Sequence, residues 1–236
     1  QLTALRALLQ SLPPEALPQL DSLLFSEPWV PLPGPQTAAF HSLADVLYYG
    51  GAAGGGKTDL LIGLALTQHR RSIIFRREAT QLQAIFDRCA EILRTREGFN
   101  GHDKIWRLPD RRQLEFGSCK DPGSETAYQG RPHDAKLFDE ITHFLEGQFR
   151  FLNGWKRTTV RGQRVRTVCA GTPPTDSDGE WVLRYWAPWL DDHHPDPAED
   201  GELRWFAMLD GKDTEVENGE TFVWKGEAIL PQSRTF

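Results

Sequence analysis

Short apolar runs alternate with amphipathic stretches through the middle of this chain. Four runs have the length and composition of buried strands: 46–49 (VLYY), 72–77 (SIIFRR), 135–138 (AKLF) and 165–170 (VRTVCA). Residues 59–67 (DLLIGLALT) and 80–94 lie between successive runs and repeat apolar side chains at helical spacing. Strands that alternate with helices predict an α/β fold with a mainly parallel central sheet flanked by helices on both faces.

Weaker patterns surround these elements. Apolar residues at helical spacing predict a helix over residues 2–12, which a pair of prolines ends. The proline-rich stretch 28–40 is expected to be an extended connector that packs on the surface of the core. Two short strand-like runs, 105–108 and 113–116, flank a polar turn and predict a hairpin.

The composition changes after residue 182. Residues 191–202 are acidic and contain prolines, which favours a loop, and two later strand-like runs flank the polar stretch 210–220. We therefore divide the chain into an N-terminal helical segment (1–27), an α/β core (28–182) and a small lid or linker subdomain (183–236).

Composition narrows the possible functions. The 236 residues are 39% hydrophobic and 25% charged, which is ordinary for a globular protein. A net charge of −6 argues against a protein that coats nucleic acid, and basic clusters such as 156–166 are more often solvated faces than DNA contacts. Three separate cysteines favour reduced structural thiols over a zinc site. No apolar run approaches the ~20 residues of a membrane span.

The segment 51–58 (GAAGGGKT) fits the phosphate-loop pattern G-x-x-x-x-G-K-[ST] at every fixed position. Glycines let successive backbone N–H groups point at phosphate oxygens. Lys57 is expected to reach the β- and γ-phosphates of ATP, and the Thr58 hydroxyl to bind Mg²⁺. A strand before the loop and a helix after it give the context that the pattern requires. We therefore predict a nucleotide site formed by Gly51, Ala52, Ala53, Gly54, Gly55, Gly56, Lys57 and Thr58.

Asp139 and Glu140 follow the run 135–138 and supply the other half of a hydrolytic site. We predict that Asp139 holds the Mg²⁺ shell and that Glu140 is the catalytic residue that polarises the attacking water. An isolated acid pair also occurs at solvated turns, but the upstream phosphate loop favours catalysis. The order of these motifs predicts a P-loop NTPase of the additional-strand, catalytic-glutamate type. We expect the loop and the acid pair to lie at adjacent strand tips around one triphosphate.

Three further residues are candidates for this site. The Gln36 amide could read the adenine edge, because it donates and accepts at once, or it could be a capping or surface residue. Thr172 ends a strand in a Gly-Thr-Pro-Pro turn, where its hydroxyl could sense the γ-phosphate or where the turn is simply rigid. A catalytic cation is also expected on the γ-phosphate. We predict Arg131, acting in cis or toward a neighbouring subunit, with Arg76 and Arg77 as alternatives.

Together these residues resemble the ATPase domain of phage terminase large subunits, the motors that pump DNA into procapsids. The matching segments keep the order of that family: LPGPQTAAF (32–40), YYGGAAGGGKT (48–58), IIFRRE (73–78), YQGRPHDAKLFDE (128–140) and CAGTPPTDSDGEWV (169–182). The resemblance places Gln36 in an adenine motif and Thr172 in a motif that couples hydrolysis to movement. One departure is that many members carry an arginine within the phosphate loop, where this chain has Ala52 and Ala53.

The resemblance implies Mg²⁺-dependent ATP hydrolysis that drives translocation of double-stranded viral DNA into a procapsid. It implies a portal protein and a small terminase subunit as partners, a ring on the portal, a monomer in isolation, and a host-cytoplasmic location without membrane contact. The nuclease domain that usually follows in this family is expected to be absent from this chain, and with it nuclease activity. Two rival hypotheses are a helicase- or recombinase-type DNA-dependent ATPase and a nucleotide-dependent switch without turnover.

Overall fold

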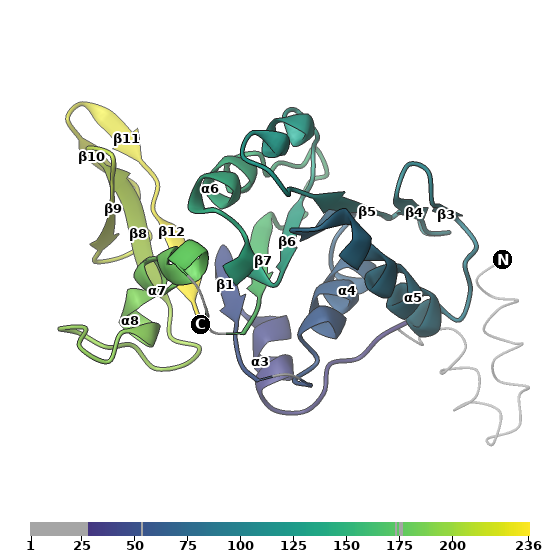
Figure 1. Cartoon of the computed structure of the whole chain (residues 1–236). Coiled ribbons are helices and arrows are strands. Elements are labelled where there is room, and N and C mark those ends of the chain that lie inside the picture. Colours follow the sequence, from purple (N-terminus) through teal and green to yellow (C-terminus); the bar gives the residue numbers. More distant parts are fainter. Residues whose placement is uncertain (1–27, 53, 173, 175–176) are drawn as a thin grey trace, which may run out of the picture.

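A computed structural model describes residues 28–52, 54–172, 174 and 177–236 of the chain (Figure 1). The segment 1–27, with the helix predicted over 2–12, lies outside the described residues. In the described part, ten strands form one sheet in the order β3-β4-β5-β2-β6-β7-β1-β12-β8-β9. Six neighbouring strands are parallel: β5 (Gln113–Ser118), β2 (Arg71–Arg76), β6 (Ala135–Asp139), β7 (Arg166–Ala170), β1 (Val46–Tyr49) and β12 (Gln232–Thr235).

The strand β7 lies between β1 and β6, so it is the additional strand that the motif order predicts. The expectation that the phosphate loop and the acid pair lie at adjacent strand tips was therefore wrong. Their strands, β1 and β6, each pair with β7 instead of with one another. The tip of β7 consequently stands between them, and it leads directly into Thr172.

Helices cover both faces of the sheet, as the alternating pattern predicts (Figure 1). On one face, α3 (Pro35–His41), α4 (Lys57–Thr67) and α5 (Leu82–Leu93) bury their apolar sides. On the other face lie α6 (Glu146–Gly154), α7 (Glu180–Tyr185) and α8 (Ala187–Leu190). Side chains along β1 alternate between the two layers, since Leu47 belongs to the first core and Val46 and Tyr48 to the second. Short 3₁₀ helices lie at Ala79–Gln81 (η2), Ser124–Tyr128 (η3), Ile141–His143 (η4) and Ser177–Gly179 (η5).

Antiparallel strands extend the sheet beyond β5. The strands β3 (Phe99–Asn100) and β4 (Ile105–Arg107) continue outward from that edge. The pairing of β4 with β5 confirms the predicted hairpin. The indole of Trp106 is fully buried and its Nε1 donates a hydrogen bond to the carbonyl of Glu97 at 2.9 Å, which fixes the outer strands on the core.

The C-terminal segment joins the same sheet instead of standing apart from it. The strands β8 (Arg204–Leu209) and β9 (Lys212–Val216) follow β12 in the sheet order, and β12 pairs directly with the strand that precedes the phosphate loop. Only β10 (Phe222–Trp224) and β11 (Glu227–Ile229) form a separate two-stranded ribbon among the described strands. The predicted boundary after residue 182 therefore corresponds to no break in the sheet.

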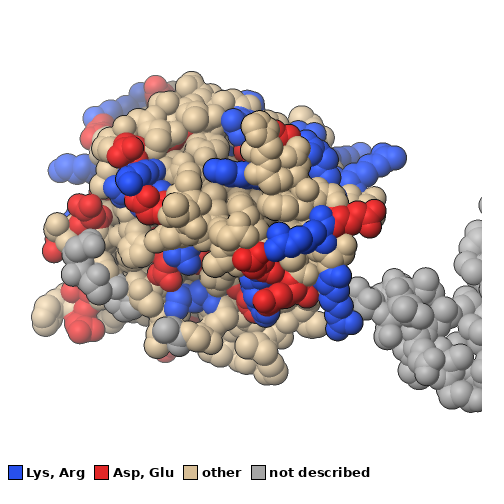
Figure 2. Space-filling view, turned by 45° about the vertical axis from the view of Figure 1, so that its right-hand side comes forward, with Lys and Arg blue, Asp and Glu red and all other residues tan. Residues whose placement is uncertain are grey.

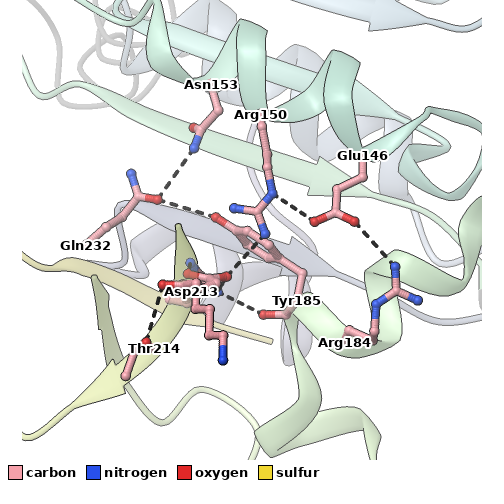
Figure 3. A network of polar contacts seen from close by, with 10 residues as sticks. Glu146, Arg150, Asn153, Arg184, Tyr185, Asp213, Thr214 and Gln232 are labelled. Carbon is pink, nitrogen blue, oxygen red and sulfur yellow. Dashed lines mark hydrogen bonds and ion pairs between the residues drawn. The ribbon is translucent and has the colours of Figure 1, made fainter. Parts of the chain in front are cut away.

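A network of polar contacts connects α6 to this C-terminal part (Figure 3). The Arg150 guanidinium reaches between Glu146 at 2.8 Å and Asp213 of β9 at 3.4 Å. Asp213 also pairs with Arg234 of β12 at 2.5 Å. The guanidinium of Arg234 lies 3.6 Å from the ring centroid of Tyr185, so the buried cation is stabilised by a carboxylate and an aromatic face together.

The exposed surface carries charges of both signs. Figure 2 shows Lys and Arg interspersed with Asp and Glu across one face, without a large region of one sign. On α5, Arg88 pairs with Asp59 at 2.7 Å and with Glu91 at 2.6 Å. Such exposed pairs each contribute little to stability, so the two apolar cores carry the fold.

Candidate functional site

The phosphate loop begins at the end of β1 and passes into the first turn of α4. Gly51, Gly54 and Gly56 have φ values of 131°, 87° and 67°, which are unfavourable for residues with a β-carbon. At Gly56 a β-carbon would also lie 2.4 Å from the Gln36 amide nitrogen. Backbone geometry therefore favours glycine at these three positions. Ala53 lies outside the described residues.

Lys57 and Thr58 are the first two residues of α4, whose N-terminal dipole favours an anion at this point. The Lys57 ammonium donates hydrogen bonds to the carbonyl oxygens of Gly51 at 3.0 Å and Ala52 at 2.8 Å. The Lys57 side chain therefore folds back across the loop. Tyr49 closes the loop from the side, because its hydroxyl donates to the carbonyl of Gly55 at 3.1 Å.

Asp139 ends β6 and faces the phosphate loop. The Thr58 hydroxyl lies 3.1 Å from both carboxylate oxygens of Asp139, which is 1% exposed. Burial raises the pKa of Asp139, while the nearby Arg76 guanidinium and the Thr58 hydroxyl act in the opposite direction. The described residues contain no cluster of three His, Cys, Asp or Glu side chains that could hold a metal ion. One hydroxyl and one carboxylate nevertheless fit Mg²⁺, which takes few protein ligands and fills its shell with phosphate and water.

Glu140 adopts a left-handed backbone conformation, with φ 56° and ψ 61°. This conformation is strained for a residue with a β-carbon, and such strain is often found at functional sites. One carboxylate oxygen of Glu140 accepts a hydrogen bond from the Thr172 N–H at 3.3 Å. The Thr172 hydroxyl is 3.5 Å from the same oxygen, and the Tyr48 hydroxyl donates to the Thr172 carbonyl at 3.3 Å. The structure thus brings Thr172 and Glu140 together beside Asp139.

Arg131 lies away from the phosphate loop of its own chain. Its guanidinium pairs with Glu115 of β5 and lies 5.3 Å from the ring centroid of Tyr128. Glu115 occupies the register level of Lys136 in the sheet, toward the beginning of β6, whereas Asp139 ends that strand. The side chain is half exposed.

The arginine that contacts the acid pair is Arg76, which ends β2. Its Nε donates to Asp139 Oδ2 at 2.8 Å. Arg77, the other alternative, is directed elsewhere and donates to the carbonyl of His143 at 2.6 Å. The sequence offered both arginines, and the strand pairing of β2 with β6 is what selects between them.

Gln36 lies against the phosphate loop, 3% exposed, at the first turn of α3. Its amide nitrogen donates to the Gly56 carbonyl at 2.9 Å, and its amide oxygen accepts from the Leu32 N–H at 2.5 Å. The amide thus fixes the approach of the preceding chain to the loop.

A cavity of about 490 Å³ opens beside α3 and the start of the phosphate loop. It lies between that helix and the C-terminal end of the chain, and its walls are mainly apolar. Its lining includes Pro35, Ala39, Tyr49, Gly50 and Phe236. The cavity is large enough for a planar base, and its position at Gly50 connects it to the loop.

Known protein families include one whose model covers most of this chain. Residues 49–225 match the model described as the terminase large subunit, T4likevirus-type, N-terminal. The large terminase of bacteriophage HK97 is similar in structure, with a TM-score of 0.48, 17% identity, and 69% of this chain and 36% of that chain covered. The ATPase domain of the Thermus phage P74-26 large terminase gives a TM-score of 0.46 and 14% identity over 77% of this chain and 82% of that chain.

Two further searches gave negative results. No curated protein matches the chain. Among the described residues, no helix is both long and apolar enough to cross a membrane.

Proposed function

Because the chain belongs to the family of terminase large-subunit N-terminal domains, the ATPase domains of phage DNA-packaging motors, we propose that it hydrolyses ATP to drive double-stranded DNA into a procapsid. The observation that carries this proposal is the 3.1 Å contact between Thr58 of the phosphate loop and Asp139, with Glu140 next in the chain. The contact joins two motifs that are 81 positions apart in sequence. It supports the proposal because it brings the predicted phosphate loop and the predicted acid pair within hydrogen-bonding distance.

Lys57, Thr58 and Asp139 bind and orient the triphosphate. Lys57 exchanges its carbonyl partners in the loop for the β- and γ-phosphate oxygens, with which it makes stronger, charge-assisted hydrogen bonds. Thr58 and Asp139 would supply the protein oxygens for Mg²⁺. When bound, the ion neutralises charge that develops on the phosphates during transfer. Gly51, Ala52, Gly54, Gly55 and Gly56 contribute backbone N–H groups to the cradle.

Glu140 acts as the catalytic base that orients and polarises the attacking water. Its strained backbone aims the carboxylate at the Thr172 turn, and the Thr172 N–H holds it there at 3.3 Å. Loss of the γ-phosphate therefore changes the surroundings of Glu140 and Thr172 together. Thr172 accordingly couples hydrolysis to movement, which is the role that the family motif implies.

Arg131 serves a neighbouring subunit. It is half exposed and remote from the phosphate loop of its own chain, so it is available to a second copy only. This assignment requires assembly into a ring on the portal and low activity of the isolated monomer. Mixing Arg131→Ala subunits with Glu140→Gln subunits tests it, because a ring that contains both retains some complete sites. If the mixed rings hydrolyse ATP no faster than rings of either variant alone, that result would contradict a role of Arg131 in a neighbouring subunit.

The cavity beside α3 takes the adenine ring. Gln36 contributes indirectly through Gly56 and Leu32, and its second amide hydrogen stays available to the base.

The polar network of Figure 3 then links the nucleotide to the C-terminal strands, because α6 follows Glu140 by one short turn and Arg150 contacts Asp213. A shift of this joint would move a DNA-gripping loop along the duplex. The portal, the procapsid and the small terminase subunit are the proposed partners of the assembled motor.

Replacement of Glu140 by Gln tests the chemical part of the proposal. We expect phosphate release to fall by about 10²–10⁴-fold, which is the usual contribution of a general base, while ATP affinity changes little. Glu91→Gln is the matched control, since this exposed acid lies on α5 and pairs with Arg88 at the surface. Wild-type turnover in Glu140→Gln with normal ATP binding would remove Glu140 from the mechanism.

A further inference from the structure

Arg76 and the phosphate-loop residue Thr58 donate hydrogen bonds to the same carboxylate oxygen of Asp139. Asp139 Oδ2 accepts from the Arg76 Nε at 2.8 Å and from the Thr58 hydroxyl at 3.1 Å. The Arg76 side chain is 20% exposed and that of Asp139 is 1% exposed, so the ion pair is screened little by solvent. The guanidinium therefore neutralises the buried carboxylate that would otherwise stand alone between β2 and β7.

The Thr58 hydroxyl lies 3.1 Å from both oxygens of this carboxylate, so Mg²⁺ held by Thr58 would bind the same carboxylate that Arg76 contacts. A cation held by Thr58 and Asp139 would lie beside the Arg76 guanidinium, and two positive charges on one carboxylate repel each other. Arg76 must then give up Oδ2 or weaken the binding of the metal. The phosphate oxygens that arrive with the nucleotide offer the guanidinium a partner with bidentate geometry.

No other described arginine is available at this point. Arg77 donates to the His143 carbonyl and Arg131 pairs with Glu115. The phosphate loop itself contains no arginine, because Ala52 and Ala53 follow its first glycine. Beside Lys57, Arg76 is consequently the cation that the fold brings to the acid pair.

We propose that Arg76 is an exchange arginine: it occupies Asp139 before the nucleotide binds and moves to the γ-phosphate when Mg²⁺ and ATP enter. This inference rests on the proposed ATPase function and adds to it a residue that distinguishes ATP from ADP within one subunit. In the exchanged position the guanidinium touches the transferred group, and it returns to Asp139 after phosphate release. The empty and ADP-bound states thus keep the carboxylate neutralised.

Binding measurements on Arg76→Ala test the exchange without any use of turnover. With excess Mg²⁺, we expect the preference for a nonhydrolysable ATP analogue over ADP to fall about tenfold, because a charged hydrogen bond to the γ-phosphate is lost. With ADP present, we expect Mn²⁺ to bind the variant about tenfold more tightly than the wild type, because the Arg76 guanidinium no longer competes for Asp139. Electron paramagnetic resonance measures this binding. These two shifts have opposite signs, which a damaged site would not produce.

Two further variants keep the test decisive. Arg77→Ala removes the neighbouring arginine, which does not contact Asp139, and we expect neither quantity to change. Arg76→Gln keeps a neutral donor toward Asp139, so it preserves the packing and should lose the ATP preference if the alanine variant fails to fold. If Arg76→Ala binds the ATP analogue and ADP equally more weakly, and also binds Mn²⁺ more weakly, Arg76 only positions Asp139. That result would overturn the exchange. A wild-type chain that binds neither nucleotide would instead overturn the proposed function itself, and the inference with it.

Discussion

The buried lysine of β6 gives a quantitative test of the fold around the site. Lys136 is fully buried, and its ammonium lies 3.0 Å from His133 Nδ1. His133 in turn contacts Glu115 at 2.9 Å, and Glu115 pairs with Arg131. Burial lowers the pKa of Lys136 from 10.5 to about 8; the Glu115 carboxylate opposes this shift and the Arg131 guanidinium adds to it. The charged form of this lysine is therefore disfavoured in the folded state.

The sign of the resulting pH dependence follows from proton linkage. Between about pH 8 and pH 10.5 the unfolded chain keeps a proton on Lys136 that the folded chain has lost, so stability rises with pH in this window. The shift from 10.5 to about 8 corresponds to about 3 kcal/mol of unfolding free energy. Replacement by Met removes this penalty but also a hydrogen bond to His133, worth about 1 kcal/mol.

We therefore expect Lys136→Met to raise the free energy of unfolding by about 2 kcal/mol at pH 7 and to lower it by about 1 kcal/mol near pH 10.5. Urea denaturation of both proteins at the two pH values measures this difference. Lys120→Met, at an exposed lysine that pairs with Glu78, is the control and should change stability by less than about 0.5 kcal/mol at both. A Lys136→Met variant that is less stable than the wild type at pH 7, or a difference that does not vary with pH, would show that burial of this ammonium does not destabilise the fold.

Three other outcomes test the packing and the site. Gly63→Ala should destabilise the fold by about 1–3 kcal/mol in thermal denaturation, because its β-carbon would lie 2.0 Å from the buried Trp29 ring; equal stability would show that Trp29 is not packed there. Asp213→Ala should lower the free energy of unfolding by about 3 kcal/mol, because it leaves a buried arginine of β12 unpaired, and an unchanged denaturation midpoint would contradict this. Gln36→Ala should weaken ATP and GTP alike if the amide only supports Gly56, whereas a loss confined to ATP would show that it reads the base.

Local patterns were sufficient to predict the segments in which apolar residues recur with the spacing of a single helix or strand. The strand at 46–49 has the predicted bounds, and α4 begins only two residues before the predicted helix. Both are strongly apolar elements in which burial and backbone preference agree. The convergence of Thr58 and Asp139 was also predictable, since the carboxyl ends of parallel strands meet at one edge of a sheet.

The sequence pattern did not predict elements that depend on tertiary contacts. The proline-rich connector was expected to be extended, yet it contains α3, because Pro35 is tolerated in a first helical turn and Phe40 packs in the core. The polar stretch 210–220 was expected to be a separator, yet it contains β9, whose Asp213 is held by Arg234 of another strand. Neither partner lies near in sequence, so no local window contains the signal.

The arginine assignments show the same limit at the site. Arg131 precedes β6 by only a few residues, which suggested proximity to Asp139, but it lies toward the opposite end of that strand. Arg76 ends the neighbouring strand at the level of the acid pair, and only the pairing of β2 with β6 reveals this. Lys136, an exception in an apolar run, is explained by a polar partner, His133, that lies three residues earlier.

We propose that the phosphate loop and the acid pair enclose one metal-bound triphosphate. A crystal structure with Mn²⁺ and a nonhydrolysable ATP analogue would locate both the metal and the phosphates. We predict an anomalous peak between Thr58 and Asp139, the β-phosphate against the loop N–H groups, and the γ-phosphate facing Glu140. A triphosphate bound elsewhere, or a metal peak remote from Thr58 and Asp139, would contradict the account.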